Sequence, residues 1–205
     1  MKLPRLHAIT DAQVLALPDF LELARRLATL GSRIAVHLRD RTATGRALAR
    51  HATALAGALA GTGAALIVSA RPDIGAAISA HGVQLGTGDL GVGDARAVLR
   101  RGWVGRSVHA IDEARAAARA GADFLVAGSI WATGSHPGLQ AQGPGMIPPM
   151  VSFGLPVLAI GGVTPARARE VKDAGAYGVA AIRAIWKAGD PAAAAEAMLE
   201  PWQGI

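Results

Sequence analysis

The chain has 205 residues, of which 51% are hydrophobic and only 4% aromatic, which is typical of a folded domain with an aliphatic core and excludes a disordered tail. It contains no cysteine, so disulfides, thiolate nucleophiles and cysteine-ligated metal centres are excluded. The 21 Lys and Arg residues outnumber the 15 Asp and Glu residues, for a formal net charge of +6, but the arginines are dispersed and no nucleic-acid-binding motif accompanies them. The excess charge is either scattered over the surface for solubility or attracts a small phosphorylated substrate.

Nothing in the sequence indicates a membrane protein. No apolar run reaches the ~18 residues of a membrane-spanning helix, and the strand-like segment 6–10 follows the N-terminus without the apolar stretch of a secretion signal. We therefore expect a cytoplasmic protein whose partner is neither a membrane nor a nucleic acid. A homo-oligomer is left open, because the apolar residues Trp131, Met146, Ile147 and Met150 would suit a dimer contact or, as we favour, the core.

Short segments rich in Val, Ile and Leu alternate along the chain with longer, alanine-rich segments of helical pattern. The short segments predict strands at residues 6–10, 33–39, 64–69, 82–86, 103–109, 124–129, 156–161 and 178–183. The longer segments predict helices near residues 17–30, 43–60, 72–80, 93–101, 111–120, 144–153, 165–175 and 190–200. Thr164 and Pro165 are typical of a helix start, and Gly121 and Gly175 of helix ends.

The alternation of eight strands with eight helices predicts a parallel sheet. Because the units are similar in size and no linker or change of composition divides them, a closed (β/α)8 TIM barrel is favoured over an open doubly wound sheet. We expect one α/β domain that spans residues 1–205. The active site of such a barrel lies at the carboxyl ends of its strands.

The strongest functional signal is a pair of glycines, Gly161 and Gly162, between the seventh strand and a helix start. Glycines allow a phosphate to approach the backbone, and the helix N-terminus favours an anion. Barrel phosphate sites commonly lie after strands seven and eight, and Ile182 and Arg183 end the eighth strand. The alternative is a tight turn needed for steric reasons alone, but the position in the barrel favours phosphate binding.

The segment after the sixth strand, residues 127–143, is too polar and glycine-rich for a helix. Loops of this length in compact barrels are usually functional. Thr133 and Ser135 would offer hydroxyl groups to a phosphate, and His136 would carry a proton or a positive charge. The alternative is a solvent-facing loop with an incidental histidine.

The second strand ends in alternating basic residues. Regular alternation points His37, Arg39 and Arg41 to the same side, where they would form an anion site. The alternative is that Arg39 forms a structural ion pair with Asp40 or Asp11.

Two further strand ends carry polar residues. Ser107 and His109 lie at the end of the fifth strand, but no carboxylate is placed to complete a catalytic triad. Asp89, in the loop after the fourth strand, is either a loop cap or one ligand of a weak magnesium site.

In combination, these motifs resemble those of the thiamine phosphate synthase and TenI (thiazole tautomerase) superfamily of barrels. The matching stretches occur in the family's order and cover nearly the whole chain: 7–11, 37–41, 82–86, 105–109, 121–124 and 161–185.

The synthase branch joins a pyrimidine diphosphate to a thiazole phosphate and releases pyrophosphate with the help of magnesium. This chain retains the serine that the synthase branch carries in strand five, and it has similar residues at the positions of the branch's basic motif in strand two. The branch's magnesium aspartate after strand three falls on Ala70, which cannot bind a metal. The strand-two motif falls on His37, Arg39 and Arg41, the strand-three asparagine on Ser69, and the strand-five serine on Ser107. The second magnesium aspartate falls on Asp89, and His136 replaces the diphosphate-binding lysine.

The TenI branch lacks the magnesium residues and isomerises thiazole phosphate with a histidine, which falls on Ser129 in this chain. It shares the Arg-Ser-Val-His run at 106–109, so we place the chain nearer to this branch. The resemblance then implies a protein that binds thiazole phosphate without a cofactor, with His136 as the proton carrier and Ser107 or His37 orienting the ring.

Two alternatives remain beside this main interpretation. The first is a divergent synthase in which Arg39, Arg41 and His136 neutralise the departing diphosphate, and only this alternative would use magnesium. The second is a non-catalytic thiazole or thiamine phosphate-binding protein, which Ser129 and Ala70 motivate.

Overall fold

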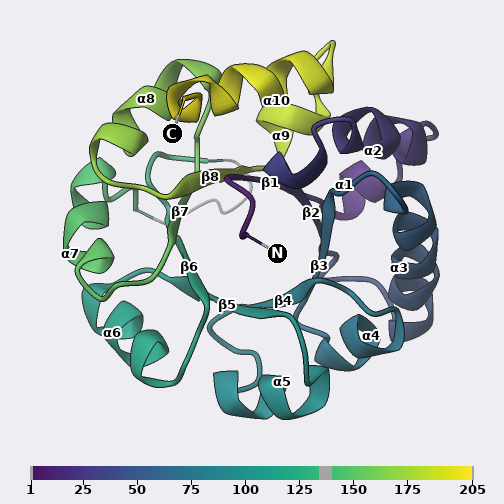
Figure 1. Ribbon diagram of the computed structural model, residues 1–205, viewed down its shortest axis with the longest axis horizontal. Coiled ribbons are helices and arrows are strands. Elements are labelled where there is room, and N and C mark those ends of the chain that lie inside the picture. The colour runs from purple at the N-terminus through teal and green to yellow at the C-terminus, as the bar shows by residue number, and fades with distance from the viewer. Residues whose placement is uncertain (1, 134–139, 205) are drawn as a thin grey trace.

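The structure is a computed structural model that describes residues 2–133 and 140–204 of the chain. Eight parallel strands close into a barrel in chain order, and the helices form a ring outside them (Figure 1). The strands are β1 (Leu6–Ile9), β2 (Ile34–Leu38), β3 (Ala65–Ser69), β4 (Gly82–Leu85), β5 (Trp103–Val108), β6 (Phe124–Ala127), β7 (Val157–Ile160) and β8 (Gly178–Ala181). The predicted (β/α)8 TIM barrel is confirmed.

The outer ring consists of α-helices and short 3-10 turns. The helices are α1 (Ala12–Leu15), α2 (Phe20–Ala28), α3 (Gly45–Leu59), α4 (Pro72–Ala77), α5 (Val92–Leu99), α6 (Ile111–Arg119), α7 (Ile147–Val151), α8 (Pro165–Asp173), α9 (Arg183–Trp186) and α10 (Pro191–Leu199). The 3-10 turns are η1 (Gly31–Arg33), η2 (Pro144–Met146) and η3 (Glu200–Trp202). No helix in the described ranges is long and apolar enough to cross a membrane.

The helix boundary signals in the sequence are mostly confirmed. Gly121 and Gly175 adopt φ of +82° and +95° after α6 and α8, as glycines that end helices do. Thr164 occupies the N-cap position of α8 and Pro165 follows it, although the Thr164 side chain makes no capping hydrogen bond.

The structure differs from the predictions mainly at short helices. No helix is predicted at α1, which begins right after β1 because Asp11 Oδ1 accepts the N–H of Val14 at 2.9 Å. β8 ends at Ala181, and Arg183 begins α9, so the strand predicted at 178–183 is too long. The helix predicted at 144–153 is a 3-10 turn followed by α7.

The chain buries two apolar regions, one between the strands and the helices and one inside the barrel. The first contains Met146, Ile147 and Met150, as the favoured interpretation of these residues expects. Inside a TIM barrel, side chains from alternate strands form layers of four. The pairing of the strands places three such layers one above another: His7, Ile67, Gly105 and Leu158; then His37, Gln84, Val126 and Ala180; then Ile9, Ser69, Ser107 and Ile160.

The N-terminal segment covers the amino ends of the strands, where it lies across the middle of the barrel in Figure 1. The Tyr177 hydroxyl donates to the Leu3 carbonyl at 2.5 Å, and the imidazole of His7 is bonded to the Pro4 carbonyl at 3.0 Å. The opposite end, where the strands terminate, is the end that carries the candidate site residues.

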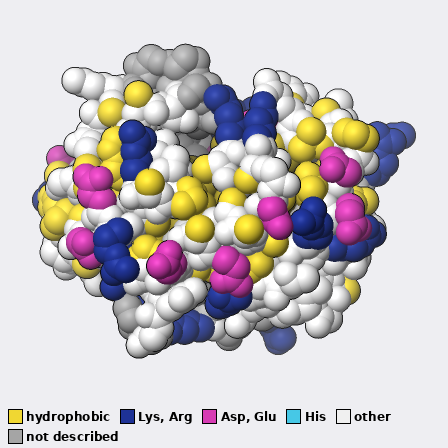
Figure 2. Space-filling view, turned by 90° about the horizontal axis from the view of Figure 1, so that it is seen from above, with side chains coloured by type: hydrophobic (Ala, Val, Ile, Leu, Met, Phe, Trp, Pro, Cys, Tyr) yellow, Lys and Arg dark blue, Asp and Glu magenta, His cyan; other side chains and the backbone are white. Residues whose placement is uncertain are grey.

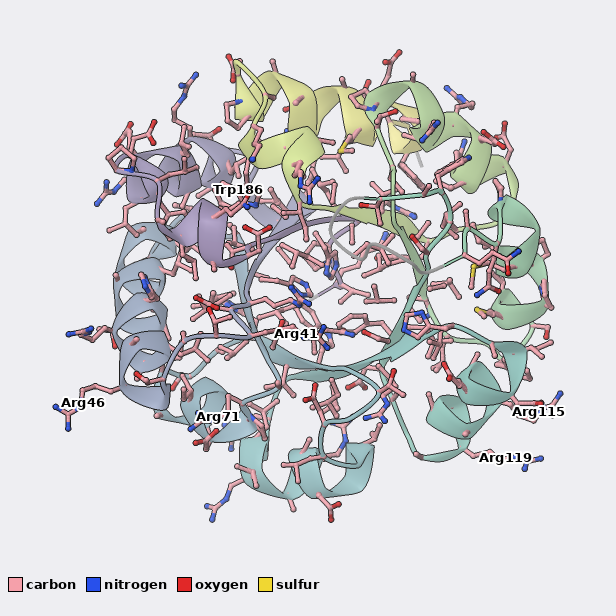
Figure 3. The ribbon with its side chains drawn as sticks, turned by 180° about the vertical axis from the view of Figure 1, so that it is seen from behind. Arg41, Arg46, Arg71, Arg115, Arg119 and Trp186 are labelled. Carbon is pink, nitrogen blue, oxygen red and sulfur yellow. The ribbon has the colours of Figure 1, made fainter. Side chains whose placement is uncertain are left out.

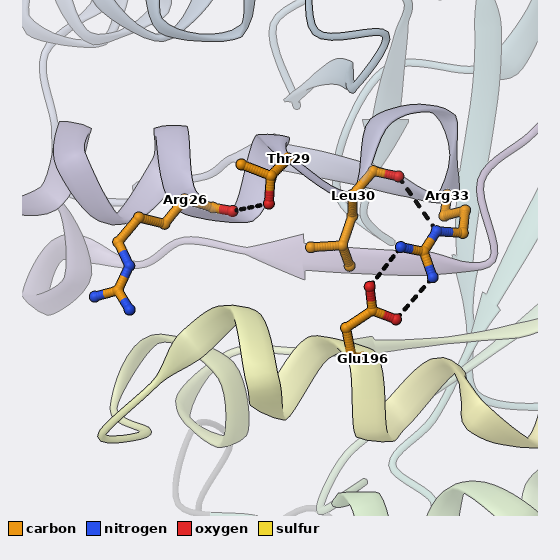
Figure 4. Close-up of polar contacts among 5 residues, drawn as sticks. All are labelled: Arg26, Thr29, Leu30, Arg33 and Glu196. Atoms are coloured by element: carbon orange, nitrogen blue, oxygen red, sulfur yellow. Dashed lines mark hydrogen bonds and ion pairs between the residues drawn. The ribbon is translucent and has the colours of Figure 1, made fainter.

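An ion pair connects the segment before β2 with α10, the last helix of the ring. Arg33, just before β2, forms a two-pronged ion pair with Glu196 of α10, with N–O distances of 2.7 and 2.5 Å (Figure 4). Both side chains are nearly half exposed, so the pair stabilises the closure by no more than about 1 kcal/mol.

Candidate active site

A cavity of about 1170 Å³ opens at the carboxyl ends of the strands. All eight strands contribute to it, either with their last residues or with the segments that follow them, so chain regions far apart in sequence meet there. Most of the predicted site residues line it: Arg39, Arg41, Ser69, Asp89, Ser107, Thr133, Gly161, Gly162, Ile182 and Arg183. A smaller cavity of about 460 Å³, beside Tyr177 and Trp202, lies away from these strand ends.

Two predicted residues, Ser135 and His136, lie outside the described residues. Thr133 is the last described residue of this loop before them and lines the cavity. The proton-carrying role predicted for His136 therefore remains a prediction.

The turn after β7 has the geometry of an anion cradle. Gly161 and Gly162 both lie in the left-handed region, with φ of +97° and +63°, which only glycine adopts readily. The Gly161 carbonyl accepts the N–H of Trp131 at 2.9 Å. Because the C=O and N–H of a trans peptide point in opposite directions, this bond turns the Gly162 N–H away from the Trp131 segment.

The turn has no room for a side chain. A Cβ atom at Gly161 would lie 2.9 Å from Ser129 Cα and 3.0 Å from Ile130 N, and one at Gly162 would lie 2.8 Å from Trp131 Cβ. The segment after β6 thus packs directly on the turn, which fixes its shape. Neither the Gly162 N–H nor the Val163 N–H donates to another described residue, so both remain available to a phosphate.

The wall of the cavity beside the end of β2 is basic. Arg39 and Arg41 follow β2 and form no ion pair within the described residues, so the alternative of a structural Arg39 pair is not observed. Burial lowers the pKa of Arg39, and the positive charge of Arg41 lowers it further. Thr10 fixes the end of this strand, because its hydroxyl oxygen accepts the Arg39 N–H at 2.9 Å.

Arg41 points toward the barrel centre, whereas Arg46, Arg115 and Arg119 point outward from the ring (Figure 3). Over the face seen in Figure 2, basic and acidic side chains are mixed along the middle, while Lys and Arg gather at the upper edge. Asp11, Asp40 and Asp89 lie near enough to Arg39 to raise its pKa in part, but neither Arg39 nor Arg41 forms a direct ion pair with a described residue. Two such guanidinium groups at one mouth attract an anion more strongly than a mixed surface does.

The floor of the cavity carries buried polar groups. Gln84 Nε2 donates to Ser107 Oγ at 2.9 Å, while Gln84 Oε1 and Ser69 Oγ are buried without a hydrogen-bond partner in the described structure. A buried polar atom without a partner is costly, so this floor is suited to a polar heterocycle that supplies the missing bonds. The sequence places Gln84 at a strand end, where site residues are expected, but assigns it no role, although the alternation in Gly82-Val83-Gln84-Leu85 points it into the barrel.

His109 is a second cavity residue for which the sequence pattern predicts no specific role. It lines the cavity, and its Nδ1 contacts the Gly128 carbonyl. Because a carbonyl only accepts, Nδ1 is the donor in this contact. The contact fixes the orientation of the His109 ring at the edge of the cavity.

His37, predicted to orient a ring, does not line the cavity. It points to the same side as Arg39, as the alternation requires, but it lies deeper in the barrel and is fully buried. His37 Nε2 lies 2.6 Å from Nδ1 of His7. Since the Pro4 carbonyl accepts from His7 Nε2, His7 Nδ1 is an acceptor and His37 Nε2 is the donor. Both rings are thus neutral, and they form one series of hydrogen bonds that ends at the Pro4 carbonyl.

This histidine pair should make the fold sensitive to acid. Burial lowers the pKa of His7 from 6.5 to about 3, and burial together with His7 lowers the pKa of His37 well below 6.5. Between pH 6.5 and about 3 the unfolded chain binds protons that the folded chain does not, so stability falls as the pH falls. Each histidine contributes at most about 1.4 kcal/mol per pH unit.

Urea unfolding at pH 7.5 and pH 5.0 measures this effect. We expect the free energy of unfolding of a His7→Gln/His37→Gln variant to change less between the two pH values than that of the wild type. An equal change in both proteins would show that the pair is not the cause.

The comparisons with known proteins agree with this geometry. The family model described as thiamine monophosphate synthase matches residues 6–185. The chain belongs to the thiamine monophosphate synthase family. A thiamine-phosphate synthase of Methanoculleus marisnigri is 38% identical over 199 residues, which cover 94% of this chain and 92% of the relative. One of Salinispora arenicola is 38% identical over 206 residues and 97% of both chains.

Solved structures show the same relationship. A thiamine phosphate pyrophosphorylase from Pyrococcus furiosus superposes with a TM-score of 0.83 at 30% identity and covers 97% of this chain and 95% of its own. An orotidine 5'-phosphate decarboxylase from Pyrococcus horikoshii superposes with a TM-score of 0.65 at 18% identity, covering 96% of this chain and 100% of its own, and shares the fold alone. The thiamine-biosynthesis family is thereby established. The relatives carry the synthase name, which favours the synthase alternative over the TenI-like main interpretation.

The magnesium site implied by the synthase branch does not fit the residues of this family member. Ala70 stands where a carboxylate would be needed, and Asp89 Oδ2 already accepts the Gly86 N–H at 2.5 Å. The described residues contain no group of three or more His, Asp or Glu side chains that could hold a metal ion. A single carboxylate makes only a weak magnesium site.

Proposed function

We propose that this protein is a thiamine phosphate synthase, which condenses hydroxymethylpyrimidine diphosphate with thiazole phosphate and releases pyrophosphate. The observation that carries the proposal is one cavity with two walls that are each suited to an anion, the Gly161-Gly162 turn and the pair Arg39 and Arg41. Two phosphorylated substrates need two such walls. The cavity volume of about 1170 Å³ also exceeds the ~300–1,000 Å³ that is common for one small ligand.

The glycine turn is suited to the thiazole phosphate. Its free Gly162 and Val163 N–H groups and the N-terminus of α8 favour a phosphate dianion. Ile182 and Arg183 line the cavity at the end of β8, as the predicted phosphate site requires. In this proposal the thiazole is held by its phosphate and its ring faces the cavity.

The basic wall is suited to the diphosphate. As the bond between the pyrimidine methylene carbon and the diphosphate oxygen breaks, negative charge develops on the leaving group, while the thiazole nitrogen bonds to the same carbon. Fixed cations beside that leaving group stabilise the transition state. We assign this role to Arg39 and Arg41, and with these two cations in place the reaction needs no metal cofactor. Both substrates are small phosphorylated molecules, and we place the reaction in the cytoplasm.

The polar floor is suited to the pyrimidine. The unpartnered Gln84 Oε1 and Ser69 Oγ, with Ser107 bonded to Gln84, offer hydrogen bonds that a heterocycle with an amino group can complete. The experiment that tests the proposal is incubation of the protein with both substrates, which should yield thiamine phosphate and pyrophosphate together.

A further inference from the structure

Arg167 is an unexpected residue in the first turn of α8. Negative side chains are favoured at a helix N-terminus and positive ones are disfavoured, because of the helix dipole. Arg167 nevertheless occupies the third position of this helix and forms no ion pair with any described residue. A cation at this end requires another source of stabilisation.

The contacts of Arg167 show what it holds. Its Nη1 donates to the Gly162 carbonyl at 2.9 Å, and its guanidinium carbon lies 4.8 Å from the centre of the Trp131 ring. Arg167 therefore ties α8, the glycine turn and the segment after β6 together. Stacking of a guanidinium on an indole is favourable in itself.

The Gly162 contact decides the direction of the next N–H. Because the carbonyl and N–H of a trans peptide are antiparallel, a Gly162 carbonyl held toward Arg167 turns the Val163 N–H to the opposite side. One residue earlier, the Trp131 N–H donates to the Gly161 carbonyl at 2.9 Å and in the same way turns the Gly162 N–H to the opposite side. Two consecutive carbonyls are thus held on one side, and two consecutive N–H groups face the other.

We infer that Arg167 is a positioning residue for the phosphate: it fixes the Gly162-Val163 peptide so that its N–H is directed at the ligand, and it adds a positive charge beside the cradle. This inference rests on the proposed function in naming thiazole phosphate as the ligand. Arg167 does not line the cavity, so its effect passes through the turn.

The test compares Arg167→Ala with Arg167→Lys and with Arg169→Ala, a control that removes an exposed arginine from the same helix. Calorimetry should show thiazole phosphate binding weakened about tenfold in Arg167→Ala, the loss of one charge-assisted hydrogen bond. Binding of the unphosphorylated thiazole alcohol should stay unchanged. Arg167→Lys should recover part of the affinity, and Arg169→Ala should bind as the wild type does.

Kinetics provide a second readout. The KM for thiazole phosphate should rise in Arg167→Ala, while the KM for the pyrimidine diphosphate stays the same. Equal binding by wild type and Arg167→Ala, or an equal loss for thiazole phosphate and thiazole alcohol, would overturn the inference. If the wild type binds no thiazole phosphate, the proposed function fails, and a comparison of inorganic phosphate binding by wild type and Arg167→Ala still decides the role of Arg167.

Discussion

A Gly161→Ala variant should bind thiazole phosphate at least about a hundredfold more weakly than the wild type. The new Cβ would lie 2.9 Å from Ser129 Cα and 3.0 Å from Ile130 N, and both of these are backbone atoms that cannot swing aside. Alanine also disfavours the φ of +97°. The turn must therefore change shape, and a displacement of about 1 Å removes the two N–H groups from hydrogen-bond reach of a phosphate.

The matched control is Gly93→Ala. A Cβ at Gly93 meets nothing within 4 Å and the residue lies within α5, so this variant should retain binding and gain about 0.5–1 kcal/mol of stability. Calorimetry measures the affinity, and thermal unfolding shows whether each variant is folded at the assay temperature. Unchanged affinity in a folded Gly161→Ala protein would refute the cradle.

An Arg39→Gln variant should lose about a hundredfold or more in kcat/KM for the pyrimidine diphosphate, because removal of one preorganised charge-stabilising donor typically costs that much. Glutamine keeps a polar side chain but removes the charge. The KM for thiazole phosphate should change little, since we place that ligand at the glycine turn.

Arg46→Gln is the control for overall charge. Arg46 lies on α3 and points outward, away from the barrel centre (Figure 3). Its loss should leave kcat/KM within about twofold of the wild type, because an exposed charge at this distance is screened by salt. Equal losses in the two variants would show that general steering, rather than a local contact with the diphosphate, explains the effect.

Much of the fold followed from the sequence pattern, because apolar strands and alanine-rich helices alternate with clear turn residues. The sequence could not reveal the short helices α1 and α9, whose four residues each carry too little periodicity to stand out. Their formation depends on local bonds, such as the Asp11 cap of α1.

The site was predictable to the extent that it lies at strand ends. Gly161, Arg39 and Ser107 line the cavity as their positions in the barrel order require. The position of His37 could not be predicted, because alternation along a strand gives the side to which a residue points but not the layer of the barrel in which it lies. Arg167 could not be found either, because its partner Trp131 belongs to a segment that only the closed barrel brings to the turn.

The most direct measurement of the central claim is product formation by the purified protein. Incubated with hydroxymethylpyrimidine diphosphate and thiazole phosphate, it should release thiamine phosphate and pyrophosphate in equal amounts. The two cationic side chains Arg39 and Arg41 should sustain this reaction when a chelator removes magnesium. Binding of thiazole phosphate without any thiamine phosphate, with or without magnesium, would contradict the synthase assignment and leave a phosphate-binding protein or a tautomerase in its place.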